Sequence, residues 1–335
     1  MSESNSIVSP GNYPASLPYK DRYGGLVVFG IFTVIAGGLC GLLVPLMFLG
    51  QAINAHNPNA SPASTAMLLP VLLIYGELAV ALVWLGIGSI KARRWARALL
   101  LIFSWSWLVM GFVTEGFMAV TMPRMLASAN GNLQAGQPVI SPAAAGTITF
   151  IMCLFIGFLF ILVPAVWIFF YGSPNVKATC EARDPMTRWT DACPLPVLAI
   201  SLWFWFAMPL FLLMPVSYHG VVPFFGTFLT GAPGDLFYLV LAVIWAWAGW
   251  RLYRLDVRAW WVLVAAFVLL VVSYVLTYSH HDILEMYRLM GYSEAQIEQI
   301  QKTGMLTGNT MAWMTGGFTV PFLGYLVFVK RYLRR

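Results

Sequence analysis

Long apolar runs dominate this chain and restrict the folds that it can adopt. Hydrophobic residues make up 60% of its 335 positions and charged residues only 10%, and its mean hydropathy is +0.77. Soluble domains carry about 25% charged residues, so this chain has too few polar groups to cover a globular surface in water. The sequence therefore predicts an all-α integral membrane protein whose partner along most of its surface is the lipid bilayer.

Eight of these runs reach the length of about 20 apolar residues that a membrane-spanning helix needs. The predicted spans are residues 24–50, 66–90, 96–122, 147–171, 195–217, 233–252, 258–280 and 308–330. The loop at 281–306 has apolar residues at helical spacing, which predicts two short amphipathic helices on the outer surface, broken at Gly291.

The distribution of Lys and Arg predicts the orientation of the spans, because these residues accumulate in cytoplasmic loops. With the N-terminus inside, 16 of the 19 Lys and Arg residues fall in inner segments and 3 in outer segments. We therefore expect a multi-pass protein of the cell membrane with both termini in the cytoplasm. The net charge of +6 is spread over separate loops, so we expect no nucleic-acid partner.

Two short basic connectors, at residues 91–97 and 251–258, indicate an internal duplication. A shift of 161 positions aligns Trp84 with Trp245, Gly88 with Gly249, Arg93 with Arg254, Arg97 with Arg258 and Ala98 with Ala259. Four spans return the chain to its starting side, so the two halves are predicted to be parallel four-helix repeats. The expected organisation is a flexible cytoplasmic tail (1–23), a first repeat (24–172), a cytoplasmic linker (173–194) and a second repeat (195–335).

Two loops have an unusual composition. The linker is rich in charged residues and proline; a plain tether is the simpler interpretation, and a fixed shape along the membrane surface is the alternative. The outer loop at 220–234 is apolar and rich in Gly and Pro. Such a loop is expected to dip into the membrane interface, to pack over the bundle, or to bind a membrane-protein partner.

Two glutamates, Glu77 and Glu115, lie within predicted spans, Glu77 near the middle and Glu115 in the outer third. Ionisable residues at such depths are costly, so they usually face the interior of a bundle and mark a site. Glu77 shares a helix face with Trp84 and Gly88, and Glu115 shares one with Gly111. The two carboxyl groups are expected at similar depths and able to meet. The alternative is a neutral glutamate that only joins helices.

Further polar residues gather toward the outer ends of the second-half spans. They are Asp235, Tyr274, Tyr278 and His281, and together with the two glutamates they form the predicted binding residues. His280, His281 and Glu285 are weak candidates for metal ligands, since His281 and Glu285 are one helical turn apart. Solvated loop histidines are the simpler interpretation, and no cofactor is predicted.

The sequence leaves three classes of function open. The preferred one is binding or translocation of a small solute, ion or proton through a polar cavity in the outer half of the bundle. The second is a non-catalytic scaffold or accessory subunit of a membrane complex, and the third is a metal-handling enzyme at the outer face. Phosphate-binding, dinucleotide-binding and serine-hydrolase motifs are missing from the sequence, which favours a protein without enzymatic activity.

Overall fold

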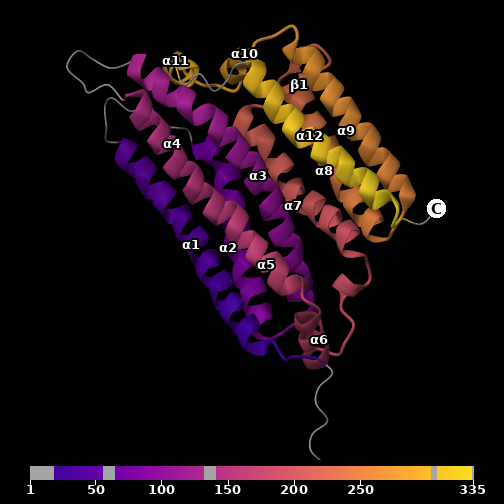
Figure 1. Cartoon of the computed structure of the whole chain (residues 1–335). Coiled ribbons are helices and arrows are strands. Elements are labelled where there is room, and N and C mark those ends of the chain that lie inside the picture. Colours follow the sequence, from indigo (N-terminus) through magenta and orange to yellow (C-terminus); the bar gives the residue numbers. More distant parts are fainter. Residues whose placement is uncertain (1–18, 56–64, 132–140, 303–307, 334–335) are drawn as a thin grey trace, which may run out of the picture.

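The structure is a computed structural model that describes residues 19–55, 65–131, 141–302 and 308–333, so most of the predicted N-terminal tail lies outside it. The described chain is almost entirely helical (Figure 1). Within it, seven helices are long and apolar enough to cross a membrane, and the chain is therefore a polytopic all-α membrane protein. Their bounds are α1 (Tyr23–Ala55), α2 (Thr65–Ile90), α3 (Arg94–Gly131), α4 to α5 (Pro142–Gly172), α7 (Leu195–Tyr218), α8 (Ala232–Tyr253) and α9 (Val257–Tyr278).

The fourth span is not the single regular helix that the sequence predicts. It consists of α4 (Pro142–Gly157), a π-helical turn η1 (Phe158–Leu162) and α5 (Val163–Gly172). Pro164 lies just beyond the π-helical turn and has no N–H group, so regular α-helical hydrogen bonding cannot continue through it. The eighth predicted span coincides with α12 (Gly308–Lys330). Among the residues of α12 that are described with their side chains, the apolar segment is Phe318–Lys330, which is shorter than a membrane span. An eighth span therefore remains a prediction.

Short elements cover both ends of the bundle. The linker forms α6 (Pro174–Arg183) and the 3₁₀ turn η2 (Trp189–Asp191). The hydroxyl of Tyr253, in the second connector, donates a hydrogen bond to the Trp189 carbonyl oxygen. We call this end, where both connectors meet the linker, the basic end. At the opposite, hairpin end lie β1 (Val222–Phe224), β2 (Thr227–Leu229), α10 (Ile283–Leu289) and α11 (Glu294–Lys302) (Figure 1).

The predictions for the hairpin end can be compared directly with the structure. Two short helices, α10 and α11, flank Gly291, whose φ is 86°, so the predicted pair of helices and their break are confirmed. Their position on the outer surface stays a prediction. The apolar loop forms an antiparallel hairpin that packs on α9. At its turn, Phe225 N–H donates to Ser273 Oγ (2.9 Å) and Gly226 N–H donates to Thr277 Oγ1 (3.1 Å). Of the three placements expected for this loop, packing over the bundle is the one observed.

Helices α1 and α2 approach each other closely because glycines face each other along their contact. A Cβ atom on Gly30 would lie 2.8 Å from the Gly86 carbonyl oxygen, and one on Gly86 would lie 2.7 Å from the Gly30 carbonyl oxygen. Further along, a Cβ on Gly37 would lie 2.9 Å from the backbone nitrogen of Val83. Small residues let membrane helices pack backbone to backbone, where van der Waals contact is the main source of stability.

The core is concentrated near the basic end and includes a buried polar network. Tyr171 of α5 is fully buried, and its hydroxyl lies 2.8 Å from Ser89 Oγ of α2. Ser89 Oγ also lies within hydrogen-bond distance, 2.9 Å, of the Leu26 carbonyl oxygen of α1. These buried hydrogen bonds thus join three helices. They fix one arrangement of the helices, because each polar group would be costly to bury without its partner.

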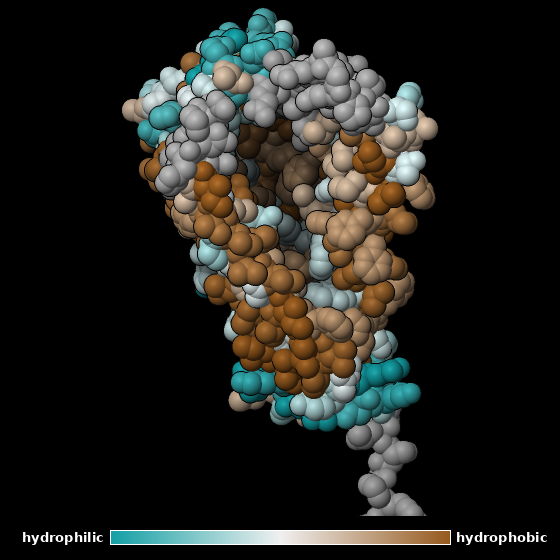
Figure 2. Space-filling model, turned by 90° about the vertical axis from the view of Figure 1, so that its left-hand side faces the viewer, coloured by the Kyte–Doolittle hydropathy of each residue, from teal (hydrophilic) through white to brown (hydrophobic). Residues whose placement is uncertain are grey.

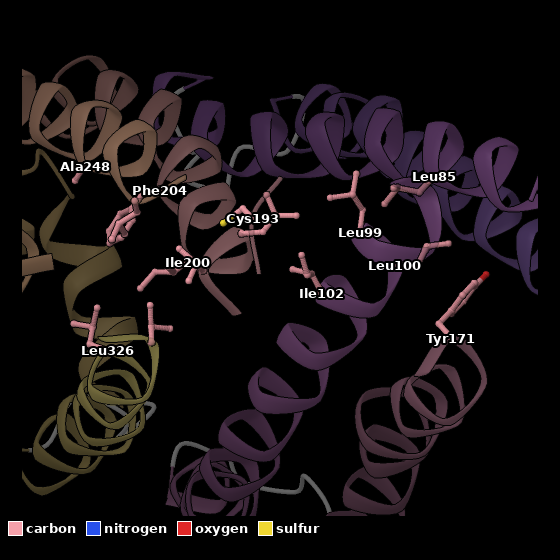
Figure 3. Packing of buried hydrophobic residues seen from close by; sticks show 14 of the residues in the cluster. Leu85, Leu99, Leu100, Ile102, Tyr171, Cys193, Ile200, Phe204, Ala248 and Leu326 are labelled. Atoms are coloured by element: carbon pink, nitrogen blue, oxygen red, sulfur yellow. The ribbon is translucent and has the colours of Figure 1, made fainter. Parts of the chain in front are cut away.

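Both halves of the chain contribute to this one core. The buried cluster includes Leu99 and Ile102 of α3, Ile200 and Phe204 of α7, and Leu326 of α12 (Figure 3). A direct hydrogen bond also crosses between the halves, since Trp203 Nε1–H donates to Ser106 Oγ at 2.8 Å. The first and second predicted repeats are therefore packed against each other.

The glycine contact between α1 and α2 predicts a sharp difference between two valine substitutions in the same helix. Gly30→Val forces side-chain atoms onto the α2 backbone and should lower the free energy of unfolding by roughly 1–3 kcal/mol, as overpacking does. Gly38→Val is the matched control, because a Cβ at Gly38 meets no atom within 4 Å. Unfolding of both variants in detergent would measure this; equal stability of the two would contradict the proposed packing.

Candidate functional site

The two glutamates within the spans both carry an oxygen that lacks a partner. Glu77 lies on α2 and Glu115 on α3, and the Oε2 atom of each is buried without a hydrogen-bond partner. No hydrogen bond joins the two carboxyl groups in the described chain, so the direct contact that the sequence allowed is not observed. Buried polar groups are nearly always paired, and an unpaired one at such depth calls for a functional or structural explanation.

Glu115 is directed from α3 toward α4. A Cβ atom on Gly157 would lie 3.8 Å from Glu115 Oε2, and the thiol of Cys153, one turn away on α4, lies beside the same carboxyl group. One turn along α3 toward the basic end, a Cβ atom on Gly111 would lie only 2.1 Å from the Phe160 carbonyl oxygen. The sequence predicts that Glu115 and Gly111 share a face of this helix, and in the structure that face packs on the fourth span.

Glu77 lies on the face of α2 that turns to α3 near the basic end. On this face the rings of Trp84 and Trp95 stack with centroids 4.1 Å apart, and a Cβ atom on Gly88 would lie 2.6 Å from Ala96 Cβ. The predicted face of Glu77 is therefore a helix-contact face toward the basic end. Trp84 is nevertheless 49% exposed, so part of this face is open to the surroundings.

A hollow opens on the side of the molecule where α1 and α4 lie. Figure 2 shows it in the upper half of that face, while the lower half is closed. The two helices meet near the basic end, where the Phe29 and Phe170 rings stack with centroids 4.3 Å apart. Toward the hairpin end, α1 stays with α2 and α4 stays with α3. The first half is thus closed at the basic end and hollowed toward the hairpin end.

The predicted residues at the end of α9 and just beyond it lie against strand β2 of the hairpin and against α10. Tyr274 and Tyr278 have ring centroids 4.4 Å apart, and the Tyr278 hydroxyl donates to Met286 Sδ of α10 at 2.7 Å. The Phe228 ring of β2 contacts both Tyr278 and His281, with centroids 6.0 and 5.4 Å apart. These side chains form an aromatic cluster that holds the hairpin and α10 to the end of α9.

The candidate metal ligands do not converge. His281 Nδ1 lies 2.8 Å from Glu285 Oε2, so these two residues pair with each other. His280 turns back to its own helix, with Nδ1 2.9 Å from the Leu276 carbonyl oxygen. Among the described residues, no group of three or more His, Cys, Asp or Glu side chains is placed to hold a metal ion.

Asp235 lines a different cavity at the hairpin end, between α7 and α8. This cavity has a volume of about 440 Å³ and is lined by Pro215, His219, Thr230, Gly231, Asp235 and Leu289. Neither the two span glutamates nor Tyr278 and His281 are among these residues. The predicted binding residues therefore do not line one cavity, and the sequence could not show this because helix order is not encoded in hydropathy.

At the basic end, the structure reveals a buried carboxylate that the sequence analysis missed. The Asp184 side chain is 2% exposed. It accepts hydrogen bonds from Arg188 Nε (3.1 Å), from the Arg94 backbone N–H (3.3 Å) and from Arg93 Nη1 (3.4 Å). The hydrogen bond from Arg188 keeps the pKa of Asp184 below its ordinary value, and the charges and N–H groups around it act in the same direction.

Two more acidic residues attach the linker to the first connector. Arg94 pairs with Glu181 of α6 (3.6 Å) and with Asp191 of η2 (3.4 Å). Asp191 also accepts the backbone N–H of Arg188 at 2.8 Å, which closes the η2 turn. The interpretation of the linker as a plain tether is wrong, because its charges bind the first connector and give it a fixed shape. The available signal was the i, i+4 spacing of Asp184 and Arg188.

Comparison with known proteins does not add to this picture, since neither a protein-family model, nor a curated protein, nor a solved structure matches the chain.

The docking of the linker predicts that Asp184→Asn will release it. The substitution leaves three cationic or N–H donors facing a neutral group, and should weaken docking by roughly 1–3 kcal/mol. Because folding lowers the pKa of Asp184, its stabilisation is present above the ordinary carboxyl pKa and is lost only as pH falls through the lowered value. At neutral pH the wild-type linker should therefore resist trypsin, whereas the variant should be cleaved after Arg183 and Arg188.

The matched control is Asp256→Asn, at the second connector. Within the described chain, the ion pair and side-chain hydrogen bond of Asp256, with Arg251 (2.8 Å) and the Arg258 N–H (2.9 Å), stay inside the second connector, so this variant should keep the wild-type cleavage pattern. Equal protection of the linker in Asp184→Asn and in the wild type would show that these ion pairs do not hold it.

Proposed function

We propose that this protein binds a small solute or cation in the hollow toward the hairpin end and moves it across the membrane, with Glu77 and Glu115 as the ionisable groups. The observation that carries the proposal is that each glutamate has a buried carboxyl oxygen without a partner. Either a proton or a cationic group of a ligand would remove the cost of an ionised carboxylate at this depth. Both are ligands that a transport cycle can exchange.

The asymmetry of the bundle supports access from the hairpin end. The basic end is closed by the Ser89–Tyr171 network and by the docked linker, and the hollow lies at the other end (Figure 2). A site that is open to one side and closed to the other corresponds to one state of an alternating-access cycle. We further propose, from the distribution of Lys and Arg, that the hairpin end faces outward at the cell membrane and both termini are cytoplasmic.

The proposal includes two parallel four-helix repeats with eight spans. In each half the first two helices form a close pair, α1 with α2 and α7 with α8. Each pair leads into a tight connector that contains a residue with positive φ, Ala92 (49°) and Leu255 (63°). In the second half, Asp235, Tyr274, Tyr278 and His281 are proposed to shape the entrance rather than the charged site.

An accessory role is the second candidate function, since the hairpin tip residue Phe225 is 46% exposed and offers a contact for a membrane-protein partner.

The proposal predicts proton movement that depends on both glutamates. Purified protein in liposomes containing a pH-sensitive dye should carry protons inward under an imposed pH gradient and a potassium diffusion potential. Glu77→Gln and Glu115→Gln should each reduce the initial rate by about tenfold or more, equivalent to losing about 1.4 kcal/mol of binding or barrier lowering.

The control is Glu294→Gln, because Glu294 lies on α11, is 75% exposed and pairs only with Arg288 among the described residues. This variant should retain the wild-type rate. Proton flux no faster than in empty liposomes, or wild-type rates in both span variants, would contradict the proposed function.

A further inference from the structure

The fourth span contains a break at a defined position. Val163 N–H donates to the Phe158 carbonyl oxygen, five residues back, which is the π-helical pattern. Pro164 then supplies no N–H group, so the carbonyl oxygen of Phe160, four residues earlier, loses its usual donor. Proline and π-helical turns are the common causes of sharp bends in helices, and π-helical turns are frequent at functional sites.

The part of this span toward the basic end is firmly held. In α5, Trp167 is 6% exposed and Tyr171 is fully buried. Tyr171 hydrogen-bonds to Ser89 of α2, and Phe170 stacks on Phe29 of α1. Movement of α5 would therefore break a buried hydrogen bond and an aromatic stack at the same time, so α5 is the fixed part of the span.

The part toward the hairpin end is held much less. None of the residues of α4 is buried, and its outward-facing side chains include Phe150 and Leu154 at 67% and 64% exposure. Segments with few buried contacts open at the lowest free energy. Where the two parts join, Gly111 of α3 lies directly against the Phe160 carbonyl oxygen. Backbone packing against backbone at this point makes it a natural pivot.

Glu115 lies one helical turn from this pivot and faces the less firmly held part. Its Oε2 atom is packed near Gly157, beside Cys153. In this packed arrangement the Oε2 atom of an ionised carboxylate would be shielded from water without a hydrogen-bond partner, which costs more than burial of the same atom in a neutral carboxylic acid. Ionisation of Glu115 therefore favours movement of α4 away from α3, because that movement admits water to the carboxylate.

We propose that α4 is an arm that turns on the π-helical turn, and that the protonation state of Glu115 sets its position. The neutral acid holds α4 against α3, and the carboxylate releases it and widens the hollow between α1 and α4. The inference rests on the proposed function, because it assigns control of access to the same site. It gives Glu115 a second role, that of a positioning residue for α4.

Few other ionisable groups act on Glu115. Cys153 is the titratable side chain of α4 that meets it, and the π-helical turn Phe158–Leu162 contains none. On α3 the residues one turn to either side, Gly111 and Met118, are uncharged. Glu77 on α2 makes no hydrogen bond to it in the described chain. The acidic residues of α6 and η2 meet α3 at the basic end, where they pair with Arg94.

Hydrogen–deuterium exchange of the full chain in lipid nanodiscs tests this arm, with wild type and Glu115→Gln compared at the same pH. The ratio of their exchange rates in peptides from α4 (142–157) is free of the intrinsic effect of pH on exchange. We expect the wild-type rate divided by the Glu115→Gln rate to be near one in acid and to rise to about threefold or more once Glu115 ionises. Peptides from α5 (163–172) should exchange equally in both proteins.

Two further variants sharpen the test. Pro164→Ala restores a donor to the helix and should slow exchange of α4 in the wild-type background at high pH, and it remains informative if Glu115→Gln does not fold. Glu77→Gln removes the same charge from α2 and should leave exchange of α4 at the wild-type rate. A ratio that is independent of pH, or that changes as much in α5 as in α4, would overturn the proposal.

The outcome is separable from that of the proposed function. Proton flux that requires Glu115 without any response of α4 would reject the arm and retain the transport proposal. A pH-dependent response of α4 in a protein that carries no protons would reject transport and retain the arm.

Discussion

The structure depends on one constraint: within a bilayer there is no water to satisfy a polar group, so each such group needs a partner inside the protein. Helices satisfy their own backbones, and Ser89, Tyr171 and the Leu26 carbonyl oxygen satisfy one another in the core. The Oε2 atoms of Glu77 and Glu115 have no such partner. They add cost to the folded state unless a proton or a cation joins them, and this is why they are the proposed site.

The same constraint explains why one end of the bundle is fixed and the other can move. Separating two apolar helix faces in a membrane costs little, because lipid replaces the lost contacts. Separating α5 from α2 exposes the Tyr171 hydroxyl, and undocking the linker takes Asp184 away from the Arg93 guanidinium and the Arg94 backbone N–H. At the hairpin end, α4 has no buried residue to lose. Helix movement in the first half is therefore expected at the hairpin end, where the hollow lies.

How far the sequence predicts this structure depends on the range of each interaction. Hydropathy reports the average surroundings of about 20 residues, so it predicts the seven long apolar helices. The break between α10 and α11 was predicted from a local signal, the glycine at position 291. The docking of Asp184 depends on which connector lies above the linker, and hydropathy does not contain that information. Hydropathy could suggest a similar depth for Glu77 and Glu115, and this stays a prediction. The direction of Glu115 toward α4 depends on the packing of helices, which the sequence does not show.

The break in the fourth span shows why a proline inside an apolar run has no fixed structural meaning. Proline leaves a carbonyl oxygen without a donor, and in lipid that group must be covered. Here Gly111 brings the α3 backbone against the Phe160 carbonyl oxygen, an approach that any side chain at this position would prevent. The pivot is therefore a property of two helices together. Since Glu115 lies one turn further along α3, the residue that permits the bend and the residue proposed to control it occupy the same helix face.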